Sequence, residues 1–335
     1  MHDDAAAAGT TLSVLVCGAG SIGMRHLRNL KTLGVTNIAV SEPNENRRQV
    51  AASEIPCTSF ADLSEALKTF KPAVVLVCSP TRDHVTQALL ASQAGAHLFI
   101  EKPLSQSLEG IDTLQKEIHD RNLVSMVGCN MRFHHGPATV HKLLDEGTIG
   151  TPREAVVYTG SFLPKWRPQQ DYRKSYSADP VQGGAILDCI HEIDLALWYF
   201  GSAKLERADV RLATPIGLTV DGTADLFLEH ENGARSKVHL SFMEPEYRRF
   251  CAIDGTRGSI DWNINQACVE VRDTEGNVTA SYPAPEGYDM NQMYLDELQH
   301  FLRGIERNEN VYNPLSEAAE TLALALAARL APPRA

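Results

Sequence analysis

Short apolar runs alternate with amphipathic segments through the first 130 residues of the chain. The run at residues 12–17 is continuous and ends at a glycine, which is typical of a strand buried on both faces of a parallel sheet. Residues 22–33 then carry apolar side chains at helical spacing and stop at Gly34. The same alternation predicts strands at 37–40, 73–78, 97–100 and 123–127 and helices at 45–52, 63–70, 83–94 and 108–119. We therefore expect a doubly wound parallel sheet with ligands at the carboxyl ends of its strands.

The second part of the chain follows a period of two. After one helix at 138–146, apolar and polar residues alternate over short segments that are separated by glycine-containing turns. We expect strands at 154–159, 224–229, 236–242, 250–254, 259–263 and 267–272, and helices at 184–198, 289–307 and 315–330. The length of 335 residues fits two domains that share a cleft.

Composition and charge exclude several classes of protein. The chain is 43% hydrophobic and 22% charged, which is ordinary for a soluble globular protein, and no apolar run is long enough to span a membrane. The first residues are acidic where a secretory signal is basic, so we expect a cytoplasmic location. A net charge of −11 argues against nucleic acid as a partner.

A glycine-rich turn joins the first strand to its helix. Its sequence is Gly18-Ala19-Gly20-Ser21-Ile22-Gly23, and the strand–turn–helix context predicts a site for a nicotinamide or flavin dinucleotide. Glu42 stands roughly 20 residues beyond the last glycine, as expected for the acid that accepts hydrogen bonds from ribose hydroxyls. Because a carboxylate repels a 2′-phosphate, we favour NAD(H) over NADP(H). Arg47 either contacts the cofactor or is an exposed helix charge.

Two further segments follow buried strands of the same sheet. Ser79 and Pro80 should border the nicotinamide, and His84 either joins them or is an ordinary first-turn residue of the next helix. Glu101-Lys102-Pro103 follows the strand expected at 97–100, which puts Lys102 at the carboxyl end of that buried strand. A Lys-Pro pair in a surface turn is the alternative interpretation.

The expected helix at 184–198 brings a histidine close to several carboxylates. Asp188 and Asp194 are each three residues from His191, so helical spacing lets carboxylates flank the imidazole and orient it. A solvated polar helix face is the alternative. We expect no metal, because the segment lacks the second histidine of H-E-x-x-H and no cysteine pair supplements it.

Together these motifs resemble the glucose-fructose oxidoreductase, inositol dehydrogenase and MocA (Gfo/Idh/MocA) family over nearly the whole chain. The resemblance implies a Rossmann domain at 1–129, a C-terminal α/β domain with a large, mostly antiparallel open sheet at 130–335, and NAD(P)-dependent oxidation or reduction of a sugar-like carbinol. It also implies that Lys102 is the catalytic lysine and that His191 is the histidine of the second motif. The family aspartate usually lies four residues before the histidine, where this chain has Leu187. Asp188, three before, is the candidate, with Glu192 and Asp194 as alternatives.

A cluster of basic and aromatic residues lies between 160 and 176, in a stretch similar to family members linked with surface-glycan and sugar-nucleotide metabolism. Such residues suit an anionic sugar through arginine contacts and ring stacking. The candidates for substrate contact are Lys165, Trp166, Arg167, Tyr172, Asn130, Arg132 and His191. A loop pinned by aromatic residues against its own domain is the alternative.

The sequence-based hypothesis is hydride transfer between nicotinamide and a carbon of a sugar derivative, with Lys102 and His191 managing the hydroxyl proton. An inositol dehydrogenase is the alternative within the enzyme class. A non-catalytic, dinucleotide-sensing regulatory protein is the alternative from another class. Because an open sheet face needs covering, we also expect a homodimer or homotetramer.

Overall fold

The computed structural model describes residues 11–333. The acidic N-terminal residues that suggested a cytoplasmic location lie outside this range. Internal contacts divide the chain into two compact units, the first running to Cys129 and including Asn291–Ala319, the second comprising Asn130–Met290 and the chain from Glu320 onward. The single boundary expected at residue 129 would place Asn291–Ala319 in the second unit, whereas in the structure this segment belongs to the first.

The first unit is built on a six-stranded parallel sheet. Its strands are β1 (Val14–Cys17), β2 (Ile38–Ser41), β3 (Thr58–Phe60), β4 (Val74–Val77), β5 (His97–Glu101) and β6 (Ser125–Gly128), in the order β3-β2-β1-β4-β5-β6. Every residue of β1, β2, β4 and β6 is buried. This confirms the predicted doubly wound sheet and explains why its strands are continuous apolar runs.

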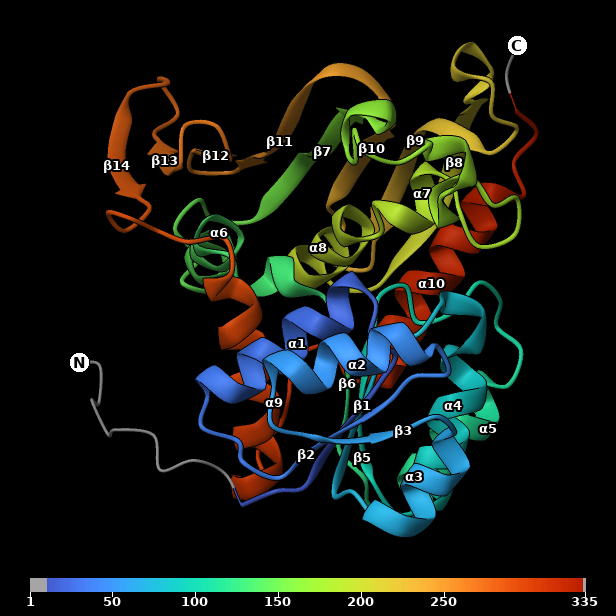
Figure 1. Cartoon of the computed structure of the whole chain (residues 1–335). Helices are drawn as coiled ribbons and strands as arrows, with labels where there is room; N and C mark the ends of the chain where they lie inside the picture. Colours follow the sequence, from blue (N-terminus) through green and yellow to red (C-terminus); the bar gives the residue numbers. More distant parts are fainter. Residues whose placement is uncertain (1–10, 334–335) are drawn as a thin grey trace. The chain divides into compact units, whose positions relative to one another are not determined.

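Helices flank this sheet (Figure 1). They are α1 (Ser21–Thr32), α2 (Glu45–Glu54), α3 (Leu63–Phe70), α4 (His84–Gln93), α5 (Ile111–Asp120) and the returning helix α9 (Gln292–Arg307). Helix α1 packs against α9, while α4 packs against both α3 and α5. Asn44 and Asp62 cap α2 and α3 by accepting backbone N–H bonds, which sets where these helices begin. Helix α9 is amphipathic and buries Leu298, Phe301 and Leu302.

The second unit contains an eight-stranded sheet in the order β14-β13-β12-β11-β7-β10-β9-β8. The strands are β7 (Pro152–Phe162), β8 (Ala203–Leu212), β9 (Asp221–His230), β10 (Arg235–Ser241), β11 (Met243–Gly255), β12 (Ser259–Asn263), β13 (Cys268–Arg272) and β14 (Val278–Pro283). Only the pairing of β7 with β10 is parallel among these strands. The large, mostly antiparallel sheet is thus confirmed.

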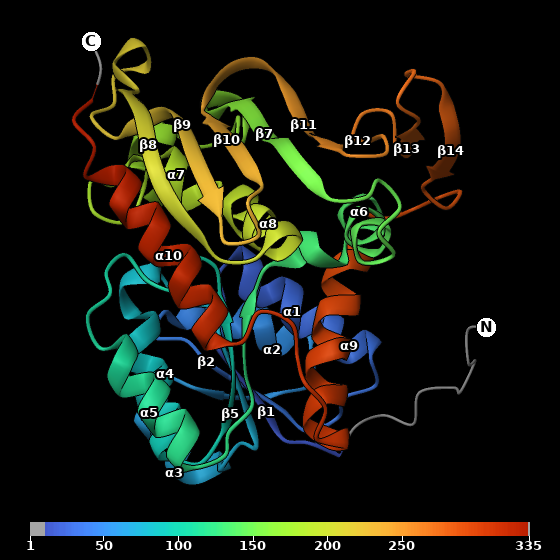
Figure 2. The same cartoon turned by 180° about the vertical axis from the view of Figure 1, so that it is seen from behind.

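Helices of the second unit lie along one face of its sheet (Figure 2). They are α6 (His135–Asp145), α7 (Ala185–Asp188), α8 (His191–Phe200) and the end of α10 (Leu315–Arg329). On β7 the buried residues Ala155, Val157 and Thr159 alternate with less buried residues such as Tyr158, which point to the opposite face. Within residues 11–333, no helix of the second unit covers that second face, which is called the outer face below.

Several boundaries differ from those expected. The single helix predicted at 184–198 is wrong, because Cys189 adopts φ −95° and ψ 31° and interrupts the helix between α7 and α8. Strands β3, β8 and β14 escaped prediction because each has few buried residues and little apolar alternation. Short 3-10 turns lie at Thr81–Asp83, Asn130–Phe133, Leu163–Lys165, Tyr172–Lys174, Tyr176–Ala178 and Thr214–Ile216.

Candidate active site

The glycine-rich turn between β1 and α1 leaves space at one glycine and none at the other two. Gly18 has φ +95°, and a Cβ there would lie 2.8 Å from the Cys78 carbonyl oxygen. A Cβ on Gly23 would lie 2.0 Å from the Gly18 carbonyl oxygen, whereas one on Gly20 would meet no heavy atom within 4 Å. Gly18 and Gly23 therefore serve the turn and its packing, and Gly20 leaves the backbone open to a ligand.

The start of α1 and the end of β2 complete this cradle. Among the described residues no side chain caps α1, and no acidic residue occupies its first turn, so Ser21 and Ile22 begin a helix that suits a phosphate. Glu42 is 5% exposed, and its two carboxylate oxygens accept the backbone N–H groups of Ala19 and Asn44, both at 2.9 Å. A carboxylate has about four acceptor positions, so Glu42 retains acceptors for ribose hydroxyls. These residues fit a dinucleotide.

Arg47 lies at the edge of the cradle. Its guanidinium is 3.8 Å from a Glu42 carboxylate oxygen, and its side chain is 60% exposed. Because the Arg47 guanidinium remains largely in solvent, its attraction to the buried Glu42 carboxylate is screened. The neighbouring Arg48 instead donates to the main-chain carbonyls of Glu42 and Pro43, at 2.6 and 2.8 Å.

Lys102 follows β5 directly, and a buried glutamate precedes it. The Glu101 side chain accepts a hydrogen bond from the Nε2 of His26 at 2.6 Å and another from the backbone N–H of Lys102 at 3.2 Å. His26 is fully buried in α1. The peptide bond between Lys102 and Pro103 is cis. The lysine thus lies at the carboxyl edge of the same sheet that carries the glycine-rich turn.

His84 connects the two neighbouring strand-end loops. It begins α4, is 1% exposed, and places Nδ1 3.0 Å from the Pro103 carbonyl and Nε2 2.9 Å from the Ser79 carbonyl. Burial lowers the pKa of His84, although these carbonyls and the Glu101 charge act in the opposite direction. Pro80 shapes the Ser79 loop by preceding the turn at Thr81–Asp83. Ser79, His84 and Pro103 are therefore brought together, with the imidazole buried between main-chain atoms.

Tyr294 is a neighbour of this cluster that the sequence analysis missed. It lies in α9, which returns to the first unit, and its ring packs under the Arg25 guanidinium at 4.3 Å and beside the His26 ring at 6.5 Å. Burial and then the Glu101 carboxylate raise the pKa of the phenol, while Arg25 and Lys102 oppose them. Tyr294 therefore lies within electrostatic reach of Lys102. No local motif marks it.

In the second unit, Gly184 and Asp221 fix the start of α7. Gly184 has φ +95°, and a Cβ on it would lie 2.2 Å from a carboxylate oxygen of Asp221. The other oxygen of Asp221 accepts the N–H of Ile186 at 2.7 Å. His191 begins the next helix, α8, and is 9% exposed.

Each carboxylate near His191 is bonded to a different partner. Asp188 accepts from the hydroxyls of Tyr176 and Ser177, the latter at 2.6 Å. Glu192 accepts from Arg249 at 2.6 and 3.2 Å. Asp194 forms two bonds to Arg132, at 2.9 and 2.8 Å. Because α7 ends at Asp188 and α8 begins at His191, the expectation that both share one helix face is wrong.

The two candidates just beyond the first sheet are buried. Asn130 is 6% exposed and Arg132 is 3% exposed. The Arg132 guanidinium lies over the Trp198 ring at 5.5 Å in addition to pairing with Asp194. Such a buried, bidentate pair ties the start of the second unit to α8.

The hydrogen bonds described for the basic loop join it to residues of its own unit. Lys165 donates to the Pro245 carbonyl at 3.0 Å, and Trp166 donates to the Ser161 hydroxyl at 2.8 Å. The Tyr172 hydroxyl donates to the Ile216 carbonyl at 2.9 Å. Arg167 is exposed, and Trp166 is 40% exposed. For Lys165, Trp166 and Tyr172, these contacts fit the alternative of a loop pinned against its own domain. Arg167 is the exception in the loop.

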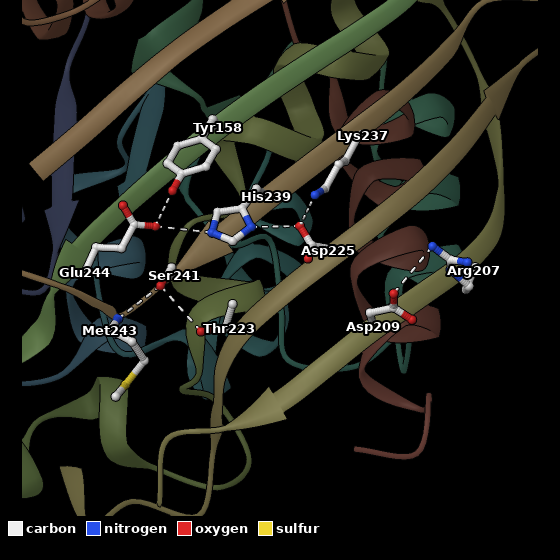
Figure 3. A network of polar contacts seen from close by, with 10 residues as sticks. All are labelled: Tyr158, Arg207, Asp209, Thr223, Asp225, Lys237, His239, Ser241, Met243 and Glu244. Atoms are coloured by element: carbon white, nitrogen blue, oxygen red, sulfur yellow. Dashed lines mark hydrogen bonds and ion pairs between the residues drawn. The ribbon is translucent and has the colours of Figure 1, made fainter. Parts of the chain in front are cut away.

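A polar cluster occupies the outer face of the second sheet (Figure 3). His239 lies between Asp225, at 2.7 Å, and Glu244, at 3.2 Å, while the Tyr158 hydroxyl also donates to Glu244. Tyr158 stacks on His239 with ring centroids 4.4 Å apart. A hollow of about 310 Å³ borders these residues. The sequence analysis did not find this cluster, because its members come from four strands.

Within residues 11–333, no helix is both long and apolar enough to cross a membrane. Over the same residues, no group of three or more His, Cys, Asp or Glu side chains is arranged to hold a metal ion.

Known proteins resemble this chain in sequence and fold. Residues 12–129 match the model described as oxidoreductase family, NAD-binding Rossmann fold, and residues 138–261 match the Gfo/Idh/MocA C-terminal domain. Myo-inositol 2-dehydrogenase of Thermotoga maritima is 27% identical over 303 residues, 88% of each chain. scyllo-Inositol 2-dehydrogenase (NAD(+)) of Bacillus subtilis is 26% identical over 85% of this chain and 84% of its own. A levoglucosan dehydrogenase complex with NADH shares the fold, with a TM-score of 0.83, 20% identity, and coverage of 95% and 96%.

Proposed function

Because the chain belongs to the Gfo/Idh/MocA family of NAD-binding oxidoreductases, we propose that it moves a hydride reversibly between nicotinamide and a carbinol carbon of a sugar or cyclitol. One observation carries the proposal: a lysine follows β5 in the same sheet whose β1–α1 turn offers a dinucleotide cradle. When bound, the nicotinamide supplies the hydride chemistry. The residues of the chain must orient the substrate and handle its hydroxyl proton.

We propose that Lys102 accepts and returns the proton of the substrate hydroxyl. His191 would be the second polar group at this hydroxyl. An unperturbed lysine has a pKa of about 10.4, and proton transfer by a positioned side chain contributes on the order of 10²–10⁴ in rate. Asp188 remains our candidate for the catalytic aspartate. Its bonds to the hydroxyls of Tyr176 and Ser177 hold it in place at the end of α7.

We propose NAD(H) as the preferred cofactor over NADP(H). The support is Glu42, whose buried carboxylate follows β2 and is held by two backbone amides. A 2′-phosphate would place two like charges together, whereas a ribose hydroxyl can donate to the carboxylate. Arg47 is too exposed to offset this charge.

For the substrate we propose a neutral cyclitol or polyol. The two inositol dehydrogenases at 26–27% identity support it, and the contacts of Lys165 and Tyr172 within their own unit weaken the argument for an anionic sugar. The second candidate is an anionic sugar or sugar nucleotide, such as those of surface-polysaccharide metabolism. The exposed Arg167 is the observation that favours it.

The test measures NADH formation on mixing the protein with NAD⁺ and a panel of inositols, free sugars, uronic acids and sugar nucleotides. We expect turnover with a neutral member of the panel. Lys102→Met should bind NADH normally, by fluorescence titration, and lose about 10²-fold or more in kcat. Arg82→Met is the matched control, since it removes an exposed cation at the same sheet edge. Full activity of Lys102→Met would remove the lysine from the mechanism.

The same panel distinguishes the enzyme from a dinucleotide-sensing regulatory protein. A sensor would bind NADH and turn over no member of the panel in either direction. Turnover that disappears in Lys102→Met excludes that function.

We further propose that the protein is a cytoplasmic homodimer or homotetramer. None of the seven cysteines, which all lie within residues 11–333, forms a disulfide bond, and this suits a reducing compartment. The outer face of the second sheet offers a surface for a second copy, and its charges of both signs suit a self-complementary contact.

A further inference from the structure

We infer that two buried histidines, His26 and His84, are positioning residues that hold Lys102 in place from either side. This inference rests on the proposed function of Lys102. His26 acts through Glu101, the residue before the lysine, and His84 acts through Pro103, the residue after it.

On the first side, the hydrogen bonds assign the tautomer of His26. Its Nε2 lies 2.6 Å from a Glu101 carboxylate oxygen, so Nε2 carries the proton. Its Nδ1 is buried and has no hydrogen-bond partner among the described residues. The ring meets the edge of Phe99, with centroids 5.2 Å apart. A buried N–H without an acceptor would be costly, so the neutral ring with the proton on Nε2 is the form that fits.

Because His26 fixes the Glu101 carboxylate, that carboxylate can hold the main chain of Lys102. The carboxylate oxygen not bonded to His26 accepts the backbone N–H of Lys102 at 3.2 Å. Glu101 is 8% exposed, so little water can replace the histidine as a partner. Loss of the His26 donor would let the carboxylate turn, and the lysine backbone would lose its acceptor.

On the other side, His84 lies between two carbonyl oxygens. Its Nδ1 is 3.0 Å from that of Pro103 and its Nε2 is 2.9 Å from that of Ser79. A neutral imidazole donates from only one nitrogen. Pro103 is buried and Ser79 is half-buried, so an unbonded Pro103 carbonyl would be the more costly of the two. We therefore assign the proton to Nδ1, which holds the residue after Lys102.

This pair of contacts on either side of Lys102, called the His26–His84 bracket below, affects the chemical step more than cofactor binding. A displacement of about 1 Å at a reacting group can cost roughly 10²-fold in rate. The glycine-rich turn and Glu42 do not depend on either histidine for any of the hydrogen bonds described above. Variants that release Lys102 should therefore lose kcat and keep their affinity for NADH.

Substitution by asparagine or by glutamine tests which of the two ring nitrogens of each histidine is the required donor. The asparagine amide nitrogen replaces Nδ1, and the glutamine amide nitrogen replaces Nε2. At position 26, where Nε2 donates, we expect His26→Gln to stay within about threefold of the native kcat and His26→Asn to lose about tenfold or more. At position 84, where Nδ1 donates, the order reverses: His84→Asn is active and His84→Gln is impaired.

The same two substitutions at His97 provide the matched control. His97 lies at the opposite end of β5, where its Nδ1 accepts the Val124 N–H at 2.9 Å. Neither His97→Asn nor His97→Gln should change kcat. Thermal unfolding of all six variants separates a loss of position from a loss of fold.

A second readout is independent of turnover. The ε-amine of Lys102 is labelled with an amine-reactive acetylating reagent, and its labelling rate is followed by mass spectrometry. We expect faster labelling in His26→Asn and His84→Gln and a native rate in His26→Gln and His84→Asn. This result would support the bracket even if no substrate of the panel were oxidised. Equal effects of asparagine and glutamine at both positions, or kcat losses that follow the melting temperature, would overturn it.

Discussion

Glu42 serves two purposes with one carboxylate. It holds the glycine-rich turn through Ala19 and the start of α2 through Asn44, and it presents negative charge where the ribose of a dinucleotide would lie. The two purposes respond differently to neutralisation, because an amide side chain still accepts one hydrogen bond but no longer repels a phosphate.

We therefore predict that Glu42→Gln shifts the cofactor preference toward NADP⁺. The ratio of kcat/KM for NADP⁺ to that for NAD⁺ should rise about tenfold, which corresponds to about 1.4 kcal/mol. Steady-state kinetics with both cofactors measure the ratio. Glu45→Gln, which removes an exposed charge in the first turn of α2, should leave it unchanged. An unaltered ratio in Glu42→Gln would show that the carboxylate does not select the cofactor.

The individual site residues that could be predicted from the sequence are those whose position relative to a nearby strand is characteristic. The glycine-rich turn, Glu42 and Lys102 each follow a recognisable buried strand, and ligands gather at the strand ends of such sheets. The partners of these residues follow no local rule. His26 and Glu101 are 75 positions apart and Arg132 and Asp194 are 62 apart, so only the folded chain shows that they pair.

At the scale of elements, α6 depends on a buried histidine at its start. The Nδ1 of His134 accepts the backbone N–H of Gly136 at 3.1 Å, and the ring packs between Trp262 and Tyr288. Burial, followed by the charges of Arg249 and His135, lowers the pKa of His134 to about 4. Protonation would place a proton on the nitrogen that accepts the cap.

The sign of the pH effect follows from this lowered pKa. Above about pH 6.5 the histidine is neutral in both the folded and the unfolded states, and its contribution to stability is complete. Between about 6.5 and 4 the unfolded chain binds a proton that the folded chain excludes, so the free energy of unfolding falls as the pH falls. The loss is at most about 3 kcal/mol.

His134→Asn should remove this part of the pH dependence, because asparagine caps helices well and does not titrate. Urea unfolding of both proteins at pH 7, 6, 5 and 4 measures this pH dependence. The other histidines are the same in both proteins, so their contribution cancels in the difference. The difference in unfolding free energy between the two proteins should change steadily in favour of the variant toward low pH. Parallel pH profiles would contradict the role of His134.

Element boundaries were predictable where burial follows a regular period. The helix at Leu63–Phe70 and the strand at Ser259–Asn263 match their predicted bounds. The break between α7 and α8 was not predictable, because apolar residues continue through Cys189 and Ile190 and both are buried. Strands such as β14 are recognisable only from their pairing partners, since most of their residues are exposed.

For the whole molecule, the outer face of the second sheet is a surface that no helix of its own unit covers within residues 11–333. Aromatic rings line it, including Tyr158 stacked between His239 and Phe250 and Phe227 under the Arg207 guanidinium. A hollow of about 600 Å³ on this face is bordered by cations and carboxylates. Such a surface suits a twofold contact, in which each patch meets a copy of itself.

We predict that Phe227→Asp weakens self-association by placing a charge among these rings. Sedimentation velocity should show the native protein as a dimer or tetramer and the variant shifted toward the single chain, with the melting temperature reporting its folding. Val181→Asp is the control, because Val181 is 63% exposed and its carbonyl accepts a hydrogen bond from Arg329 of α10, a helix on the opposite face of the sheet. A native protein that sediments as a single chain would refute the assembly. A Phe227→Asp variant of native mass would place the contact on another surface, since a charge buried in an interface without a partner costs several kcal/mol.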